Sequence, residues 1–297
     1  MIKNIEVINN RNEHTVIELS NPRPTGFLIT NIDGLDAPKG TINMIERTML
    51  DGSMYNGSRA NSRNIVMNLR YFWGNLNNDS IESIRHKSYR MCPIGEKIQL
   101  IVHTDLRDVY FNGYVESNEV NIFDKFESSQ ISIMCEDAYG RGQDNNTEGF
   151  TGITAGFELP FSNESLEEPL IEFGQVYVLT TKRIDCKSEA RTGFNLRIKF
   201  ADIISGVTVT NRTTNQTMKV NGTFLEDDVL EISTIAGHKG VTKNGVNIIG
   251  DFYTNSSNDW VELLSGANVI SVRDGTGEDV LGGSQIDIEY PLLYMGV

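Results

Sequence analysis

Hydrophobic residues recur at every second position in many short stretches of this 297-residue chain. Successive side chains of a β-strand point to opposite faces of its sheet, so this period is typical of strands with one buried face. Such stretches lie at 65–71, 98–102, 131–135, 194–200 and 286–290. Many short strands separated by turn residues indicate sandwiches or barrels. The pattern therefore predicts a mainly β protein.

One helix is predicted, from about residue 79 to residue 91. Asp79 or Ser80 can cap its start, and Pro93 stops it because proline cannot continue the hydrogen-bond ladder. We expect His86 to face solvent. The residues expected on the buried face are Ile81, Ile84 and Tyr89.

The chain is long enough for two domains. A run rich in glycine and asparagine, Gly140 to Gly149, shows no periodicity and predicts a linker. We therefore expect an N-terminal domain at 1–145 and a C-terminal domain at 146–297. Within the second domain, Asn244-Gly245 predicts a two-residue hairpin turn with positive φ at both positions.

The net charge of −14 excludes several functions. An acidic surface repels phosphate backbones and anionic lipid, so neither stable nucleic-acid binding nor membrane docking is expected. No run of about 18 apolar residues is present, and the polar N-terminus does not resemble a signal peptide. We expect a protein made in the cytosol, whose three scattered cysteines (Cys92, Cys135 and Cys186) are free thiols.

No catalytic, cofactor or metal site is predicted, because the four histidines are far apart and no nucleophile or phosphate-loop motif occurs. His103 and Asp105 are better explained by a strand entering a turn than by a metal site. The loop from Asp274 to Asp279 lacks both the dinucleotide and the calcium-loop spacing, so we expect a hairpin loop. Trp260 is a weak candidate for stacking on a sugar, and core packing is the more ordinary role.

Residues 46–63 are too long for a tight hairpin turn and are mostly polar. They carry Arg47, Arg59 and Arg63 on an otherwise acidic protein. We expect a projecting segment that lies across an adjacent subunit and offers guanidinium groups to its carboxylates. The rival interpretation is a mobile surface loop.

Several motifs in a fixed order resemble those of siphophage distal tail proteins (Dit-like). They are Gly26–Leu35, Leu50-Asp51-Gly52, Arg63–Met67, Ser129–Tyr139, Gly245–Gly250, Asp259–Leu263, Gly266-Ala267-Asn268 and the C-terminal segment Ile288–Val297. Ala138 stands where proline is common in that family, and residues 141–193 match poorly.

The resemblance implies an N-terminal β-sandwich with one helix and a C-terminal galectin-like β-sandwich. It also implies a structural, non-enzymatic virion protein, assembled in the host cytoplasm, whose N-terminal domains close into a hexameric ring. That ring would join the tail tube protein to the hub or tail-associated protein. The C-terminal domains would project outward to carry a receptor-binding or baseplate protein. An acidic lumen would suit such a ring, because it would let DNA slide past without binding.

Two other functions stay open. One is a carbohydrate-binding module or adhesin made of two sandwiches, which would use Trp260 and nearby polar loops. The chain lacks the His-Asn-Pro-Arg cluster of true galectins, so the galectin-like label brings no sugar binding with it. The other is a glycan hydrolase with an unrecognised carboxylate pair.

Overall fold

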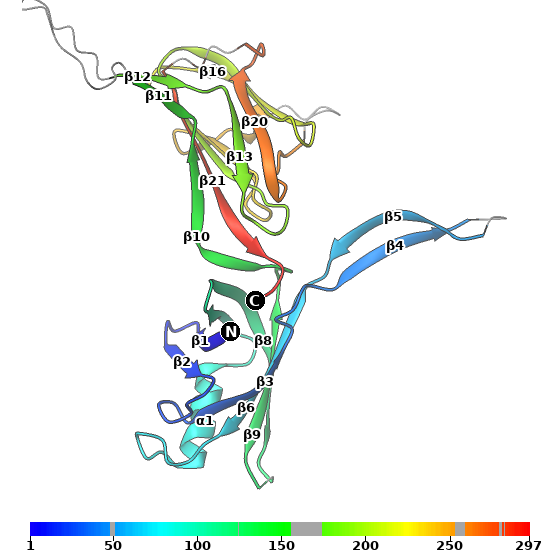
Figure 1. Ribbon diagram of the computed structural model, residues 1–297, viewed down its shortest axis with the longest axis vertical. Helices are drawn as coiled ribbons and strands as arrows, with labels where there is room; N and C mark the ends of the chain where they lie inside the picture. Colours follow the sequence, from blue (N-terminus) through cyan, green and yellow to red (C-terminus); the bar gives the residue numbers. More distant parts are fainter. Residues whose placement is uncertain (48–50, 124, 156–173, 253–258, 279–280, 282) are drawn as a thin grey trace, which may run out of the picture. The chain divides into compact units, whose positions relative to one another are not determined.

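The computed structural model of the chain describes residues 1–47, 51–123, 125–155, 174–252, 259–278, 281 and 283–297. It is mainly β with one α-helix among these residues, as predicted (Figure 1). Two compact units are present: unit 1 comprises 1–143 with 293–297, and unit 2 comprises 144–292. Among the described residues, the 11-residue helix and the other helical turn are too short to cross a membrane.

Unit 1 is a β-sandwich with one helix. Its strands are β1 (Ile2–Ile8), β2 (His14–Glu18), β3 (Phe27–Asp33), β4 (Gly40–Glu46), β5 (Ser53–Ala60), β6 (Arg63–Tyr71), β7 (Lys97–Thr104), β8 (Asp108–Asn121) and β9 (Ser128–Cys135), with α1 (Ile81–Met91) after β6. β8 joins the two layers: its first half pairs with β7 and its second half with β9. The order is then β2-β1-β7-β8 in one layer and β8-β9-β6-β3 in the other.

The core of unit 1 lies between these layers and α1. Every second residue of β6, from Ile65 to Tyr71, is buried, as the alternation predicts. Ser80 caps α1 by accepting a hydrogen bond from the Ser83 amide. Tyr71 and Ser88 join β6 to the helix through their hydroxyls, 2.9 Å apart.

The predicted helix is confirmed, but its buried face differs in part. Ile84, Ser88 and Met91 are the buried residues, whereas Tyr89 is 40% exposed. The spacing i, i+4, i+7 of the buried set is the ordinary stripe of an amphipathic helix. Ser88 is polar, so hydrophobic periodicity does not mark it as a core residue. His86 is exposed, as predicted.

Unit 2 consists of two packed sheets and a separate two-stranded ribbon. Its strands are β10 (Gly140–Gly149, which begins in unit 1), β11 (Thr151–Ala155), β12 (Gly174–Val178), β13 (Thr181–Cys186), β14 (Asn195–Lys199), β15 (Ile204–Asn211), β16 (Gln216–Phe224), β17 (Val229–Ser233), β18 (Gly240–Lys243), β19 (Val246–Asn247), β20 (Gly266–Asp274) and β21 (Gln285–Tyr294), with a 3-10 helix η1 (Ile249–Asp251). One sheet has the order β19-β18-β17-β14-β21-β10, the other β13-β20-β15-β16, and β11 pairs with β12.

The core of unit 2 fills the space between its two sheets. Leu196, Ile198 and Ile288, which the alternation marked as inward-facing, are at most 1% exposed. Asn244 and Gly245 have φ values of 51° and 78° between β18 and β19, which confirms the predicted hairpin turn.

The expected linker is not a linker: Gly140 to Gly149 forms β10, whose Arg141 pairs with Tyr110 of β8. Close packing explains the first glycine of this strand, Gly140. A Cβ on Gly140 would lie 2.3 Å from Val109 Cγ1, so a side chain does not fit. Because glycine occupies buried positions of β10, the strand shows no alternation of hydrophobic and polar residues in its sequence. The chain also returns to unit 1 at Leu293, so these last residues are not part of the second unit. The strand expected near residues 170–173 lies outside the described residues.

Candidate functional site

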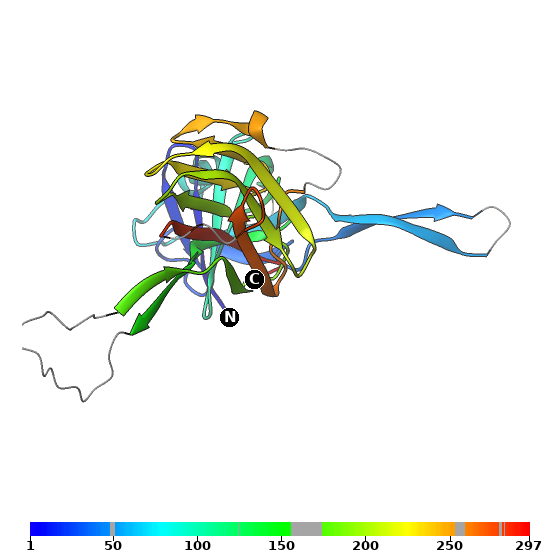
Figure 2. The ribbon, with the colours of Figure 1, turned by 90° about the horizontal axis from the view of Figure 1, so that it is seen from above.

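A two-stranded hairpin, β4 with β5, is the main candidate assembly surface of unit 1. The two strands pair with each other and with no other strand of the described chain. In both views the ribbon leaves the body of unit 1 (Figures 1 and 2). Arg47, directly after β4, and Arg59, on β5, are exposed. Two of the three predicted arginines therefore belong to a projecting segment, which begins at Gly40 and so earlier than the sequence indicated.

Arg63 is placed differently from the prediction: it lies at the start of β6 and only 4% of its surface is exposed. Its guanidinium donates hydrogen bonds to four backbone carbonyls. These are Ala138 O at 3.0 Å, Gly34 O at 2.8 Å, Asp36 O at 2.7 Å and Met295 O at 2.7 Å. These bonds and the packing of Arg63 over the Phe111 ring lie within its own unit, so its guanidinium has a structural role there and does not project toward a neighbouring subunit. The rigid guanidinium fork suits such a buried junction.

Around Arg63 the C-terminal residues are fixed to unit 1. Val297 donates its amide to Leu35 O at 3.2 Å, and Arg107 lies over the Tyr294 ring at 4.1 Å. Gly34, with φ of 89°, makes the tight turn beside Arg63, where a Cβ would lie 2.1 Å from Asn64 O. Burial lowers the pKa of Arg63, but arginine remains charged at neutral pH. This junction is structural, and the sequence did not reveal it.

Trp260 is placed in a packing role in unit 2. Its ring stacks on Phe252 at 4.5 Å with an angle of 12° between the planes, and it packs against the core. Lys239 Nζ lies 5.6 Å from the centre of the same ring. Since one face of the indole is covered by Phe252, this geometry supports the core role over the sugar-stacking role.

The other candidate polar groups are engaged locally. The Asp274 carboxylate accepts hydrogen bonds from the amides of Thr276 (3.0 Å) and Glu278 (2.7 Å), which makes it the organiser of its own turn. His103 Nδ1 lies 2.9 Å from Asp108 and its Nε2 lies 3.4 Å from Glu6. Within the described parts of the chain, no cluster of three or more histidines, cysteines or carboxylates is arranged to hold a metal ion.

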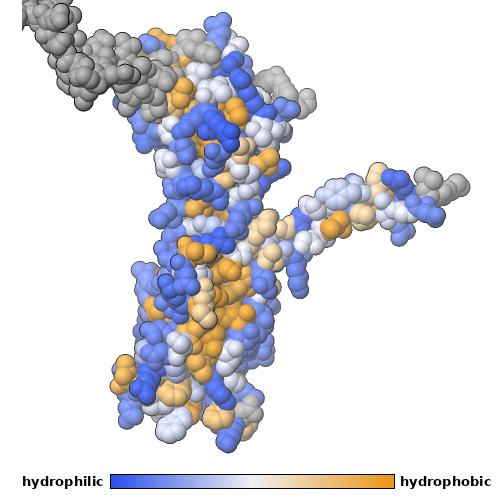
Figure 3. All heavy atoms as spheres, viewed as in Figure 1, coloured by the Kyte–Doolittle hydropathy of each residue, from blue (hydrophilic) through white to orange (hydrophobic). Residues whose placement is uncertain are grey.

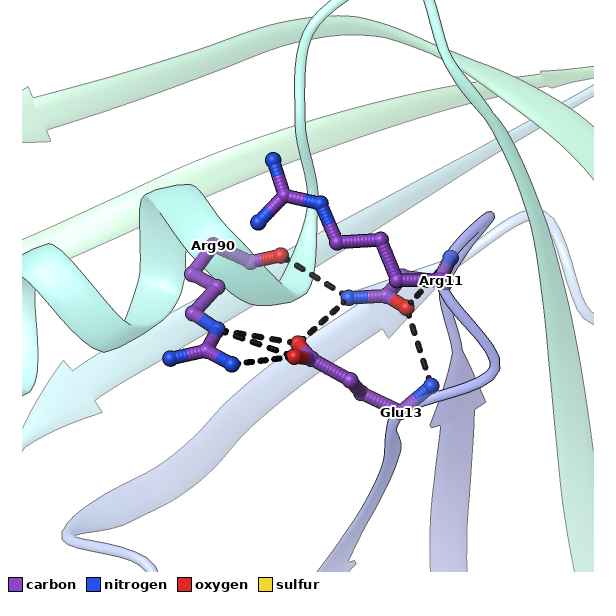
Figure 4. A network of polar contacts seen from close by, with 4 residues as sticks. Arg11, Glu13 and Arg90 are labelled. Atoms are coloured by element: carbon purple, nitrogen blue, oxygen red, sulfur yellow. Dashed lines mark hydrogen bonds and ion pairs between the residues drawn. The ribbon is translucent and has the colours of Figure 1, made fainter.

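A polar network closes the β1–β2 turn against the end of α1 (Figure 4). Glu13 is paired with Arg90 of the last helical turn, and Asn9 Nδ2 donates to Glu13 Oε2 at 3.0 Å and to Arg90 O at 3.1 Å. The hydrogen bond from Arg90 is the main reason why the pKa of Glu13 is lowered to about 2. The groups of Asn9, Glu13 and Arg90 that dashed lines join in Figure 4 hold the turn against the helix, so the network has a structural role.

A shallow hollow of about 700 Å³ lies over the outer face of the β14–β17–β21 sheet in unit 2. The strand register places Arg197 directly between Glu231 and Asp287, and Arg197 Nε is 3.8 Å from Glu231 Oε1. Glu289 accepts a hydrogen bond from Asn145 at 2.8 Å. The face offers charge and hydrogen bonds, and its lining residues include no phenylalanine, tyrosine or tryptophan. It suits polar contacts with a partner better than catalysis.

Sequence reasoning missed the apolar side chains of the hairpin. Ile42 and Met44 alternate with Thr41 and Asn43, which is a strand signal, but Ile45 interrupts the alternation directly afterwards. In the structure these residues and their β5 partners are exposed, and hydrophobic spheres lie among hydrophilic ones along the ribbon (Figure 3). The hairpin therefore presents apolar as well as charged groups.

Comparison with known proteins finds one family match and several similar structures. Residues 187–289 match the family model described as the siphovirus-type tail component, C-terminal domain. No curated protein matches the chain at a significant level. The crystal structure of SPP1 Dit (gp 19.1), described as a paradigm of the hub adsorption apparatus in phages that infect Gram-positive hosts, has a TM-score of 0.63 at 12% identity. The alignment covers 97% of this chain and 99% of that chain.

Two structures of the phage P2 baseplate in its activated conformation, with Ca and with Sr, also align. They cover 97% and 96% of this chain and 98% and 97% of theirs, at 11% and 10% identity with TM-scores of 0.43 and 0.42, too remote to add to the argument. The family match over residues 187–289 and the full-length fold shared with SPP1 Dit agree with each other and with the mainly β architecture. Residues 187–289 therefore match the C-terminal domain of siphovirus-type tail components, and the chain as a whole shares its fold with SPP1 Dit.

Proposed function

We propose that this tail protein assembles as a ring of six copies at the distal end of the tail, where it joins the tail tube protein to the hub or tail-associated protein. The observation that carries the proposal is the fold shared with SPP1 Dit over nearly the full length of both chains. That protein is described as a hub adsorption apparatus. The chain's own contribution to the argument is an exposed hairpin that has no partner strand outside itself among the described residues.

In this proposal the N-terminal domain, residues 1–145 together with the C-terminal residues that return to it, makes the ring contacts. Arg47 and Arg59 are exposed on the hairpin of a chain with a net charge of −14, so a neighbouring copy offers carboxylates within reach of their guanidinium groups. A contact of one surface with a different surface of the next copy closes into a ring when the rotation per copy is a simple fraction of a turn.

The second domain, placed by sequence at 146–297, then serves as the attachment point for a receptor-binding or baseplate protein. Support comes from the match of residues 187–289 to the C-terminal domain of siphovirus-type tail components and from the polar outer face around Arg197. In this proposal the second domain is a galectin-like β-sandwich. The acidic balance argues against stable binding to DNA that would pass through the ring.

The test is light scattering with electron microscopy on the full-length protein, alone and mixed with the tail tube and hub proteins of the same phage. Six-copy rings are expected. In a matched variant, residues 41–59 are replaced by a short glycine-serine linker, which fits because Gly40 and Ala60 already face each other across the ladder. This variant is expected to stay monomeric while keeping the unfolding midpoint of unit 1. A full-length protein that stays monomeric in all these mixtures refutes the ring.

A further inference from the structure

Four asparagines of this chain are followed directly by glycine, at positions 56, 112, 221 and 244. In such a pair the backbone nitrogen of the glycine can attack the side-chain carbonyl carbon of the asparagine, because glycine has no side chain to hinder the approach. The new C–N bond closes a five-membered succinimide, and the amide group leaves as ammonia with the proton of the glycine N–H. Water then opens the ring to aspartate or isoaspartate. The chain therefore places one reactive dipeptide in four structural settings that can be compared within the same molecule.

Two of the four pairs, Asn56-Gly57 on β5 and Asn221-Gly222 on β16, lie at interruptions of their strands. At each, the two residues of the pair stand opposite a single residue of the neighbouring strand, which is a β-bulge. Both asparagines are exposed, and neither side chain has a hydrogen-bond partner among the described residues. Nothing lies within 4 Å of the position that a Cβ on either glycine would take. Both pairs therefore have the space and the freedom that ring closure requires.

The pair Asn112-Gly113 is held by packing inside β8. It lies in an uninterrupted part of the ladder, with Asn112 opposite Gln99 and Gly113 opposite Cys135. Gln99 Nε2 donates a hydrogen bond to Asn112 Oδ1 at 3.3 Å. Gly113 is buried, and a Cβ on it would lie 2.7 Å from Ile133 Cγ2. The glycine nitrogen therefore cannot turn toward the asparagine side chain unless the ladder opens.

The pair Asn244-Gly245 is held in a different way. Its hairpin turn is exposed and its glycine has open space around it, so packing gives no protection. The side chain itself is fixed at both ends: Asn244 Nδ2 donates to Asp228 Oδ1 at 2.7 Å, and Asn244 Oδ1 accepts from the Val229 amide at 2.8 Å. Ring closure requires the side chain to rotate, and that rotation breaks both hydrogen bonds.

We propose that Asn56 and Asn221 are sites of spontaneous deamidation in the folded protein, whereas Asn112 and Asn244 keep their amides. The last two react only after a local opening, and an opening that costs about 1.4 kcal/mol slows the reaction about tenfold. Each conversion replaces a neutral amide by a carboxylate, so two conversions take the net charge from −14 to −16. Residues 39–61 hold three cations and two carboxylates, so conversion of Asn56 removes the net positive charge of the hairpin. The proposal does not depend on the proposed ring.

The test follows all four sites by peptide mapping and mass spectrometry while dilute full-length protein is incubated at slightly alkaline pH. Asn56 and Asn221 should convert at least about tenfold faster than Asn112 and Asn244. An isoaspartyl methyltransferase should detect isoaspartate at both, because the succinimide gives that product and direct hydrolysis of the amide gives aspartate only. In urea-unfolded protein the four sites should convert at similar rates, because they share the Asn-Gly sequence.

Two results would overturn the proposal. One is conversion of Asn112 or Asn244 in the folded protein as fast as that of Asn56. The other is an absence of conversion at either bulge while the unfolded chain converts there. The N56Q variant is the site control: it should lose the signal at position 56 and leave the rate at Asn221 unchanged.

The D228A variant tests the protection of Asn244 directly. Removing the acceptor of its Nδ2 should raise the rate at Asn244 about fivefold, which is the equivalent of one hydrogen bond of about 1 kcal/mol. The rate at Asn112, in the other unit, should not change. Slow reaction of the buried Cys186 thiol shows that unit 2 of the variant is folded. An unchanged rate at Asn244 in the folded variant would refute the assignment of its protection to this hydrogen bond.

Discussion

Replacing Arg63 by methionine should destabilise unit 1 selectively. The substitution keeps a long side chain over Phe111 but removes the donors to four carbonyls, and it leaves these acceptors in a site where the side chain is 4% exposed. A net loss of about 1 kcal/mol for each hydrogen bond gives about 4 kcal/mol. With a urea dependence of roughly 2 kcal/mol per molar for a domain of this size, the unfolding midpoint of unit 1 should fall by about 2 M.

The chain carries its own reporters for this assay, because Cys92 lies in the core of unit 1 and Cys186 in the core of unit 2. Pulsed thiol labelling across a urea series, read by mass spectrometry, gives a midpoint for each unit. In R63M the midpoint for Cys92 should move and that for Cys186 should not. R59M, on the exposed hairpin, is the matched control and should stay within about 0.5 kcal/mol of the wild type. A Cys92 midpoint in R63M equal to that of R59M would refute the structural role of Arg63.

Three further predictions concern proteolysis, acid and thiols. Limited trypsin treatment should cut first after exposed Arg47. Arg141 lies in the stretch that the sequence predicted to be a linker, but it should resist because it is paired in β10 and held by Asp137 at 2.8 Å. Early fragments ending at Arg141 would contradict this. The pKa of Glu13 is lowered to about 2 mainly by a hydrogen bond from Arg90, and the pKa of Asp228 is lowered to about 2 mainly by one from Lys243. The stability that these two carboxylates contribute is therefore complete above about pH 4.5 and is lost as the pH falls toward 2. Urea midpoints measured from pH 6 to pH 2.5 should fall in that window, less so in the double variant E13Q/D228N. Burial raises the pKa of the Cys92 thiol to about 12 and that of the Cys135 thiol to about 11, so the native protein should react slowly with thiol reagents. Titration of the unfolded, unreduced protein should find three free thiols, and finding a single one would contradict this prediction.

Most of the fold was predictable because alternating hydrophobicity specifies which face of a strand is buried. In β6 and β14 every residue predicted to face inward is buried. The same rule failed for β10, where close packing against Val109 requires glycine at Gly140, and glycine carries no hydrophobic signal. Alternating hydrophobicity also did not show that the last residues return to unit 1. Their return depends on a hydrogen bond between Arg63 and Met295, which are 232 positions apart in the sequence.

The candidate site was predictable only in part, and for a related reason. A stretch of polar residues with three arginines indicated a projecting segment, which the structure contains, but charge alone does not separate an exposed arginine from a buried one. Arg59 and Arg63 are four positions apart, yet one is on the hairpin surface and the other bonds four carbonyls. That difference depends on backbone oxygens brought together by tertiary structure. No local pattern encodes it.

The low identity to SPP1 Dit, 12%, has a consequence for how the assembly should be studied. A β-sandwich is maintained by the alternation and volume of its inward residues, so a shared fold survives while most outward residues change. Contacts between copies are made by outward residues, and for this chain they must be determined from its own surface. The apolar pairs Met44–Tyr55 and Ile45–Met54 belong to that surface, lie outside both cores and contribute to neither. Because folding does not require these side chains, substituting them tests assembly without disturbing the fold.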